Sequence, residues 1–386
     1  MGTEKPDQHR PKPPQVQENW LAMIAGKPQV GLAEYPLLSD AHVTGQFSAG
    51  PYTLINTAPV PEERIVKPTI VLRIAEHLAP ESPSFKKTDA ALYHGGAFPE
   101  EVASLMSLAL GIRVRAGMAS RIFLMDDPKG QPISWGRRQY QTEIIDKSRQ
   151  GWVLPRVAQG PHSLSDLERI FNIPHLPFDT CIVLLRAARM YQEALWISES
   201  APSLSWLLLV SAVETAASHF GVQKSDALTS LKDWNPNLYR TLESCEQSTL
   251  QTVAEQLRQI SGSTRKFLDF MMHFKPAESA DRPPEQFQIA WTDTNLRGAL
   301  NKIYNYRSKA LHDGTPFPFP MCEPPIKLEA HWKAPSEKPL GSVSALGAVW
   351  VEDDLPMLLH TFEYIARNAL VKWWQQSLQL DKVSGL

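Results

Sequence analysis

Residues 204–219 constrain the fold more than any other stretch, because they are apolar on almost every face of a helix. Such a helix has no side suited to water, so other elements must surround it. Neighbouring segments with helical patterns are residues 178–200, 248–260, 263–273, 294–311 and 353–378. We therefore predict an all-α helical bundle over residues 161–386, interrupted by a proline-rich loop at 315–339.

The first 160 residues have a different pattern, in which strand signals and helix signals are mixed. Residues 51–58 and 69–74 contain several β-branched side chains and are bounded by proline, which predicts strands. Residues 99–110 begin with proline and two glutamates, which favours a helix N-terminus. We predict an α+β domain over residues 20–160. Residues 1–19 are polar and proline-rich, which predicts a disordered tail.

The expected fold class is thus an α+β N-terminal domain followed by an all-α bundle, with the boundary near residue 160. Just after that boundary, Ser165 and Glu168 have the spacing of a capping box. In a capping box the two side chains satisfy the first free amides of a helix. This pattern predicts that a helix begins at residue 165.

Composition excludes several classes of protein. The chain has 39 Lys and Arg against 41 Asp and Glu, so it does not coat nucleic acid through bulk positive charge. Its three cysteines are scattered, and its histidines lack the spacing of a metal site, so we expect neither a disulfide framework nor a metal or other cofactor. We find no signal peptide and no apolar segment near the roughly 20 residues that span a bilayer. A cytoplasmic protein without a membrane partner is expected.

Two opposite charges interrupt apolar helices of the predicted bundle. Arg307 lies in the middle of a helical stripe formed by Leu296, Leu300, Ile303 and Ala310. Glu214 is the only acidic residue of the central apolar helix. A buried charge is costly unless it is paired, so we expect Arg307 and Glu214 to meet. A purely structural ion pair would produce the same pattern.

The helix that carries Arg307 also carries a recognisable motif. The run from Arg307 to His312, Arg-Ser-Lys-Ala-Leu-His, fits the Arg-x4-6-His motif of HEPN domains, and its flanking residues resemble the Apea-like branch. The resemblance covers roughly residues 165–380. It implies a helical bundle that dimerises, and a metal-independent ribonuclease whose arginine and histidine come from two protomers. Ser308 departs from the asparagine, aspartate or histidine that often follows the arginine, and the proline-rich loop is long.

The chemistry of the two motif residues suits RNA cleavage. Histidine titrates near neutral pH, so His312 is the candidate general acid or base. Arginine binds phosphate through two parallel N–H groups, so Arg307 is the candidate phosphate ligand. Glu214, Ser308 and Asp313 are supporting candidates, although Asp313 also suits a turn and His312 a helix cap. On an ideal helix His312 lies about 140° from Arg307. A shared cleft therefore needs either an unwound last turn or a second copy of the chain.

A second candidate for RNA contact lies at residues 111–156, where basic residues outnumber acidic ones and aromatic residues are interleaved. Alternation within 112–116 predicts a strand with Arg113 and Arg115 on its polar face. We select four arginines of this segment as candidate RNA-binding residues: Arg113, Arg115, Arg137 and Arg138. A solvated hairpin face is the alternative.

The sequence therefore predicts a metal-independent endoribonuclease similar to HEPN toxins and defence effectors. Its expected partners are an RNA substrate, a second copy of the chain, and an antitoxin or defence protein. The alternative from a different class is a non-catalytic HEPN-like module that binds nucleotides or proteins.

Overall fold

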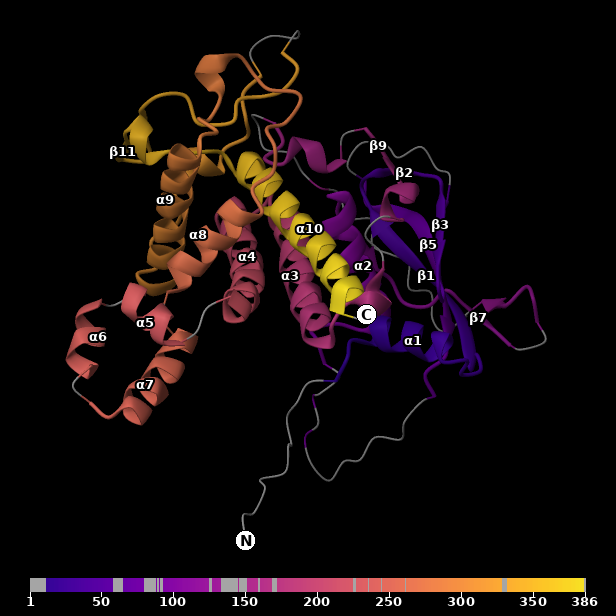
Figure 1. Cartoon of the computed structure of the whole chain (residues 1–386). Helices are drawn as coiled ribbons and strands as arrows, with labels where there is room; N and C mark the ends of the chain where they lie inside the picture. Colours follow the sequence, from indigo (N-terminus) through magenta and orange to yellow (C-terminus); the bar gives the residue numbers. More distant parts are fainter. Residues whose placement is uncertain are drawn as a thin grey trace.

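The computed structural model describes residues 12–57, 65–79, 88, 90, 93–124, 127–132, 145, 151–158, 160–168, 172–224, 227–234, 236–243, 245–260, 262–327 and 332–384. An antiparallel sheet lies on one side of the molecule and a set of long helices on the other (Figure 1). Helices α2 and α10 lie between them. The architecture is therefore mixed, with most strands in the first half and most helices in the second. The prediction that residues 161–386 are all-α is wrong, because residues 161–163, 343–345 and 348–350 form short strands.

The helices of the described residues are α1 Gln15–Ile24, α2 Phe98–Leu110, α3 Phe178–Ile197, α4 Pro202–Lys224, α5 Ala227–Trp234, α6 Pro236–Leu242, α7 Gln247–Ile260, α8 Ser263–His273, α9 Asp293–His312 and α10 Leu359–Ser384. The strands are β1 Gly31–Ser39, β2 His42–Thr44, β3 Gln46–Ala49, β4 Tyr52–Asn56, β5 Lys67–Glu76, β6 Arg115–Ala116, β7 Arg121–Phe123, β8 Gln131–Pro132, β9 Pro161–Ser163, β10 Val343–Ala345 and β11 Ala348–Trp350. The helices predicted at 99–110 and from 178 to 274 are confirmed, and α8 has the predicted bounds.

The main sheet has the strand order β3-β4-β5-β1-β7-β8, with β6 also paired to β1. Both predicted strands belong to it, as β4 and β5. Side chains alternate across the sheet, and those on one face are buried against α1 and α2. The buried set includes Leu37, Tyr52, Leu54, Ile70, Leu72 and Ile74.

The central helix α4 is surrounded by other elements, as its apolar sequence predicts. Trp206, Leu209 and Val213 are fully buried. Trp206 of α4 stacks on Phe317, which follows α9, and on Phe362 of α10. These three parts of the chain therefore meet at one indole ring. Helices α3, α8 and α9 cover the remaining faces.

One continuous cluster of buried apolar side chains extends from the sheet through α2 into the helices, so the two halves share a core. Polar contacts also cross the predicted boundary. Arg367 of α10 donates hydrogen bonds to the carbonyls of Leu108 and Ala109 at the end of α2. The neighbouring Gly111 leaves room for this guanidinium, since a Cβ there would lie 2.8 Å from Nε of Arg367.

Residues 15–19 correct the predicted disordered tail, because they form the first half of α1. Their polar side chains bind buried backbone groups instead of water. Gln17 donates to the carbonyls of Ile173 and Leu176 in the second half. Asn19 donates to the carbonyl of Ala75 at the end of β5. The tail prediction for residues 1–11 lies outside the described residues.

Two other local predictions are wrong, and one hairpin was missed. The capping-box segment forms a 3-10 helix, Leu164–Leu167, whose cap is Ser163 and not Ser165. The terminal helix begins at Leu359, six residues later than predicted, because residues 352–354 form a separate 3-10 turn. The hairpin of β10 and β11 was not predicted. Its strands have only three residues each, too few for an alternating pattern to be distinctive.

Helices α5, α6 and α7 form a small satellite beside the bundle (Figure 1). Their buried apolar side chains pack with one another as a separate cluster that includes Leu231 and Leu250. This satellite joins α8 at Gly262, which lies between the predicted helical segments 248–260 and 263–273.

Candidate functional site

Arg307 is held in place by two residues that bind each other. Its Nη2 group donates to Oε2 of Glu214 on α4, which confirms the predicted ion pair. The hydroxyl of Tyr304, one turn earlier on α9, donates to Oε1 of the same carboxylate at 2.6 Å. Burial, and then the bond to Glu214, raise the pKa of Tyr304 to about 12, so it remains a donor at neutral pH.

The arginine is sheltered but still has hydrogen-bonding capacity. The side chains of Arg307 and Glu214 are 19% and 16% exposed. Nε of Arg307 is buried and has no hydrogen-bond partner within the described part of the chain. The guanidinium carbon lies 5.6 Å from the centre of the Tyr304 ring. An anion that contacted the exposed part of this side chain would meet a guanidinium that Glu214 already orients.

We expect the variant Glu214→Gln to lower the free energy of unfolding by about 1–3 kcal/mol, because it weakens a charged hydrogen bond in a sheltered place. In a double-mutant cycle with Arg307→Met, chemical denaturation should give a coupling energy clearly different from zero. The control is a second cycle, which combines Arg307→Met with Glu255→Gln at an exposed glutamate of α7. Additive effects for Glu214 and Arg307 would contradict the pairing.

His312 lies on a different side of α9 from Arg307. The helix runs through His312, and Asp313 caps it by donating its backbone N–H to the carbonyl of Lys309. Because the last turn is not unwound, the two motif residues remain about 140° apart around the helix. His312 is exposed, and the chain reverses at Gly314, whose φ is +68°. Within one chain, Arg307 and His312 do not form one cleft.

The other supporting candidates have minor roles in the geometry. Ser308 is half-buried next to Arg307. Asp313 is exposed, and its backbone performs the turn function that the sequence allows. Tyr304 was missed, although a signal was present: it lies three residues before Arg307 and so shares its helix face.

Arg113 corrects the prediction of an RNA-binding strand. It is fully buried and forms ion pairs with Asp40 at 2.9 Å and with Glu199 at 3.2 Å. Its side chain is therefore not available to RNA. Residues 112–114 lie outside a strand and enter the core between the two halves, which removes the polar face that alternation predicts.

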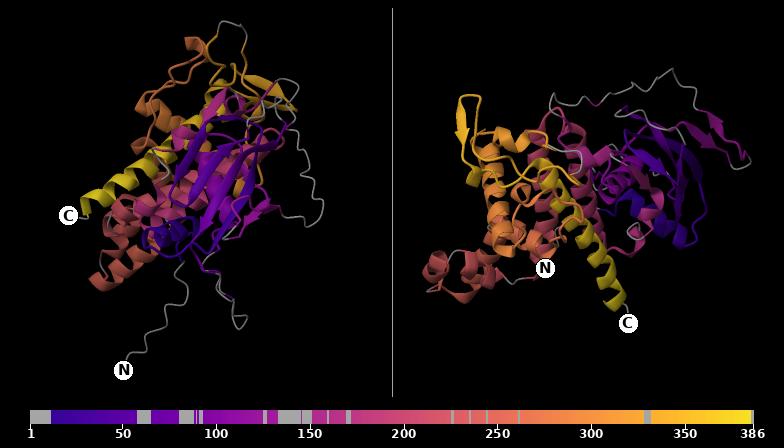
Figure 2. Two further views of the ribbon diagram at one scale, coloured as in Figure 1. Left: turned by 90° about the vertical axis from the view of Figure 1, so that its right-hand side faces the viewer. Right: turned by 90° about the horizontal axis from the view of Figure 1, so that it is seen from above.

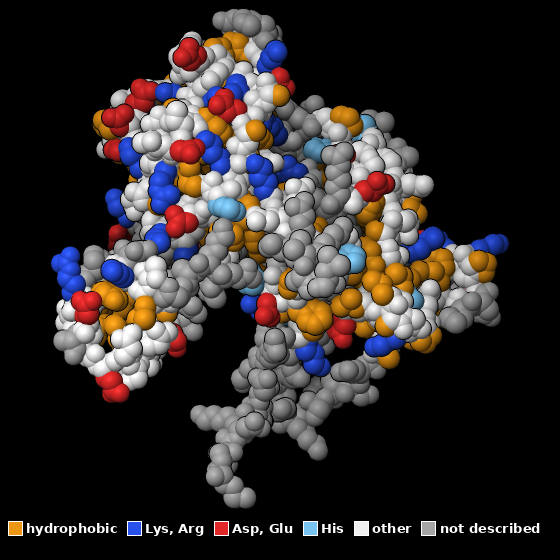
Figure 3. Space-filling model, in the orientation of Figure 1, with side chains coloured by type: hydrophobic (Ala, Val, Ile, Leu, Met, Phe, Trp, Pro, Cys, Tyr) orange, Lys and Arg blue, Asp and Glu red, His pale blue; other side chains and the backbone are white. Residues whose placement is uncertain are grey.

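Of the remaining three candidate arginines, only Arg115 belongs to the described residues. Arg115 is partly exposed, pairs with Glu193 and lies over the ring of Trp196. Arg137 and Arg138 lie outside the described residues. On the face shown in Figure 3, basic and acidic side chains are interspersed over the helical half, as the small net charge suggests.

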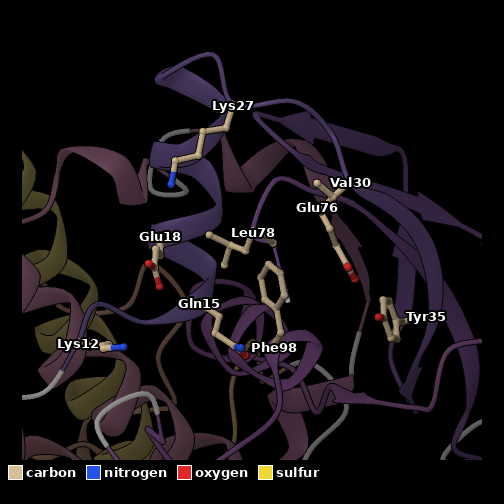
Figure 4. Close-up of a pocket in the computed structure, with 10 residues that line it drawn as sticks. Lys12, Gln15, Glu18, Lys27, Val30, Tyr35, Glu76, Leu78 and Phe98 are labelled. Carbon is tan, nitrogen blue, oxygen red and sulfur yellow. The ribbon is translucent and has the colours of Figure 1, made fainter. Parts of the chain in front are cut away.

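A cavity of about 700 Å³ opens in the first half, between α1, the start of β1, the end of β5 and the start of α2 (Figure 4). Phe98 and Leu78 lie at its centre, Lys27 and Glu18 on the side of α1, and Glu76 with Tyr35 on the side of the sheet. Burial, and then the neighbouring carboxylate of Glu76, raise the pKa of Tyr35. This cavity is built from other elements than those that carry Arg307.

Comparison with protein-family models, with curated proteins and with solved structures found no match to this chain. In the described residues, no three His, Cys, Asp or Glu side chains are grouped as metal ligands would be. None of the described helices is both long enough and apolar enough to cross a bilayer.

Proposed function

We propose that the protein is a metal-independent endoribonuclease of the HEPN type that acts as a dimer. The observation that carries the proposal is the fixed Arg307: Glu214 and Tyr304 orient it on the helix that ends at the exposed His312. A structural ion pair alone needs no second hydrogen bond from Tyr304 and no neighbouring histidine. The site is complete when Arg307 of one copy and His312 of the other face the same phosphate.

The reaction follows from the two side chains. Neutral His312 takes the proton of the 2′-hydroxyl, whose oxygen then attacks the adjacent phosphorus. The bond from phosphorus to the 5′-oxygen breaks, and that oxygen leaves with a proton from the imidazolium. The products are a 2′,3′-cyclic phosphate and a 5′-hydroxyl. Arg307 stabilises the negative charge on the non-bridging oxygens throughout.

We expect His312→Ala to slow RNA cleavage by at least about a hundredfold, the usual contribution of a general acid or base. The assay follows 2′,3′-cyclic phosphate ends in the presence of EDTA, and circular dichroism verifies the helix content. His42→Ala, which removes an exposed histidine of β2, should cleave like the wild type. If His312→Ala also cleaves like the wild type, this site is not the nuclease.

A mixing experiment tests the composite cleft. Arg307→Ala and His312→Ala are each expected to be inactive, but their mixture should recover about a quarter of wild-type activity. The reason is that half of the dimers contain both variants, and one of their two sites then has both wild-type residues. Light scattering on the full chain should show a dimer at micromolar concentration. No recovery from a mixture that forms mixed dimers would place the two residues in separate roles.

The alternative, a non-catalytic module that binds nucleotides, is favoured by one observation. The cavity beside α1 has the volume for a small ligand, an aromatic ring at its centre and two lysines on its wall, Lys12 and Lys27. Calorimetric titration with nucleoside triphosphates tests it, and Lys27→Gln should weaken any binding.

In cells, toxicity of the wild type but not of His312→Ala on induction would support a toxin or defence effector instead.

A further inference from the structure

The outer face of the main sheet is covered at one end, where Leu38 packs in a cluster with Trp196 of α3. Away from that end, two adjacent rows of side chains lie where no described helix covers the sheet, beside a third row that contains the buried Pro36. The first row is Ser48, Thr53, Arg73, Glu34 and Arg121, and the second is Ala75, Leu32 and Phe123. The strands face the viewer in front of the helices in the left view of Figure 2.

This face is neither a core nor an ordinary solvated surface. On the opposite face most side chains of β1, β4 and β5 are buried, whereas Leu32, Ala75 and Phe123 are half-buried here. A water-facing sheet surface is normally polar. Aliphatic and aromatic side chains in the second row therefore leave an apolar strip beside the charged row.

The charged row has more positive than negative charge. Arg73 donates to Oε1 of Glu34 through Nε at 3.1 Å and through Nη2 at 2.6 Å. Arg121 lies 3.7 Å from Oε2 of the same carboxylate. One carboxylate thus serves two guanidinium groups, each 40% exposed. The exposed Lys129 follows in the turn before β8, and its carbonyl accepts a hydrogen bond from Arg121. Asp127 of the same turn accepts the backbone N–H of Lys129 at 2.9 Å, so the turn adds no net charge to the row.

Arg73 also forms a stacking platform. Its guanidinium carbon lies 5.2 Å from the centre of the Phe123 ring, so an arginine lies over an aromatic ring in the middle of the open face. Bases of single-stranded RNA stack on aromatic rings and on guanidinium planes. The adjacent surplus of positive charge suits the phosphate backbone.

We propose that the outer face of the sheet binds single-stranded RNA without strong sequence preference, with bases stacked at Arg73 and Phe123 and phosphates near Arg121. A protein partner would use the apolar strip but would not need the net positive charge of the row beside it, in which two arginines share one carboxylate. The charge of the face therefore favours the polyanion. Binding here is separate from cleavage at His312 and does not depend on it.

The test measures binding of a fluorescein-labelled single-stranded polyuridine by fluorescence anisotropy. His312→Ala is the background, so that cleavage does not interfere. We expect Phe123→Leu and Arg73→Gln each to weaken binding at least about fivefold, the loss of one stacked base. The matched control is Arg297→Gln on α9, since Arg297 is also half-exposed and paired, in its case with Asp269. The control should bind like the background.

Arg73→Lys distinguishes stacking from charge. It keeps the charge but loses the planar group, so we expect its affinity to fall nearly as far as that of Arg73→Gln. Melting temperatures close to that of the background verify that the variants fold. Wild-type affinity in both Phe123→Leu and Arg121→Gln would overturn the proposal. Loss of dimerisation in these variants with unchanged RNA binding would overturn it too, and would identify the face as a protein interface.

Discussion

Replacement of Arg113 by methionine is expected to lower the free energy of unfolding by about 3–5 kcal/mol, the cost of removing one partner from a buried charge cluster. The side chains of Asp40 and Glu199 are 0% and 2% exposed, so the variant leaves two carboxylates in the core without their cation. Arg113 also donates to the carbonyl of Leu195 and the hydroxyl of Ser198. These contacts join the residue after β1, the segment after α2, and the end of α3 with the residues that follow it.

Arg115→Met is the matched control, because Arg115 is two residues away but pairs with Glu193 near the surface, where both side chains are more than a third exposed. We expect it to cost less than about 1 kcal/mol. Urea denaturation of both variants measures the difference. Neutralising the acids in the Arg113→Met background, with Asp40→Asn and Glu199→Gln, should recover part of the loss. Equal effects of Arg113→Met and Arg115→Met would show that the buried cluster contributes little.

The second prediction with a large effect on stability concerns Glu101 of α2, which binds the start of α1. One carboxylate oxygen accepts the backbone N–H of Val16 at 2.8 Å, and the other is buried without a partner in the described structure. The hydroxyl of Tyr52 binds the carbonyl of Val16 at 2.6 Å. Burial raises the pKa of Glu101 to about 7, although the Val16 bond and the charge of Arg189 lower it.

The sign of the pH dependence follows from this raised pKa. Between pH 4.5 and about 7 the folded protein holds a proton on Glu101 that the unfolded chain has released. The stabilisation is complete below pH 4.5 and is lost as pH rises through 7. A shift of this size corresponds to about 3 kcal/mol as an upper bound. The neighbouring Tyr52 and Cys181 remain neutral in this range, because burial raises the pKa of both.

Glu101→Gln should therefore raise the free energy of unfolding at pH 8 by about 2 kcal/mol and have little effect at pH 5. The amide carbonyl keeps the bond to Val16 and carries no charge to be desolvated. Thermal unfolding at a series of pH values measures both the gain in stability and its weaker dependence on pH. Glu255→Gln on the exposed face of α7 should leave the profile as it is. A profile for Glu101→Gln parallel to that of the wild type would contradict a carboxyl that titrates near pH 7.

The sequence was most informative where a charge interrupted an apolar helix. Glu214 and Arg307 each break such a stripe, and a buried charge needs a partner, so their pairing was predictable without knowledge of the fold. The helical wheel also predicted that His312 and Arg307 diverge. Both inferences use only local geometry and the cost of burial.

The failures have the opposite origin, because they depend on partners far along the chain. Alternation placed Arg113 on a polar face, but its acidic partners lie 73 and 86 residues away, and nothing near residue 113 indicates them. The wrong prediction of a disordered tail at residues 15–19 has the same cause. Gln17 has the character of a solvated tail residue until the carbonyls of Ile173 and Leu176 are placed beside it.

The hydrogen bonds between α10 and α2 join residues that are far apart in the sequence. Arg367 lies 259 residues after Leu108 and 258 residues after Ala109, the two residues whose carbonyls it binds. Contacts of this kind form only when a very long loop of chain has closed, and such non-local contacts slow folding. The end of α2 therefore acquires its last hydrogen-bond donors only when the helical half has packed against it.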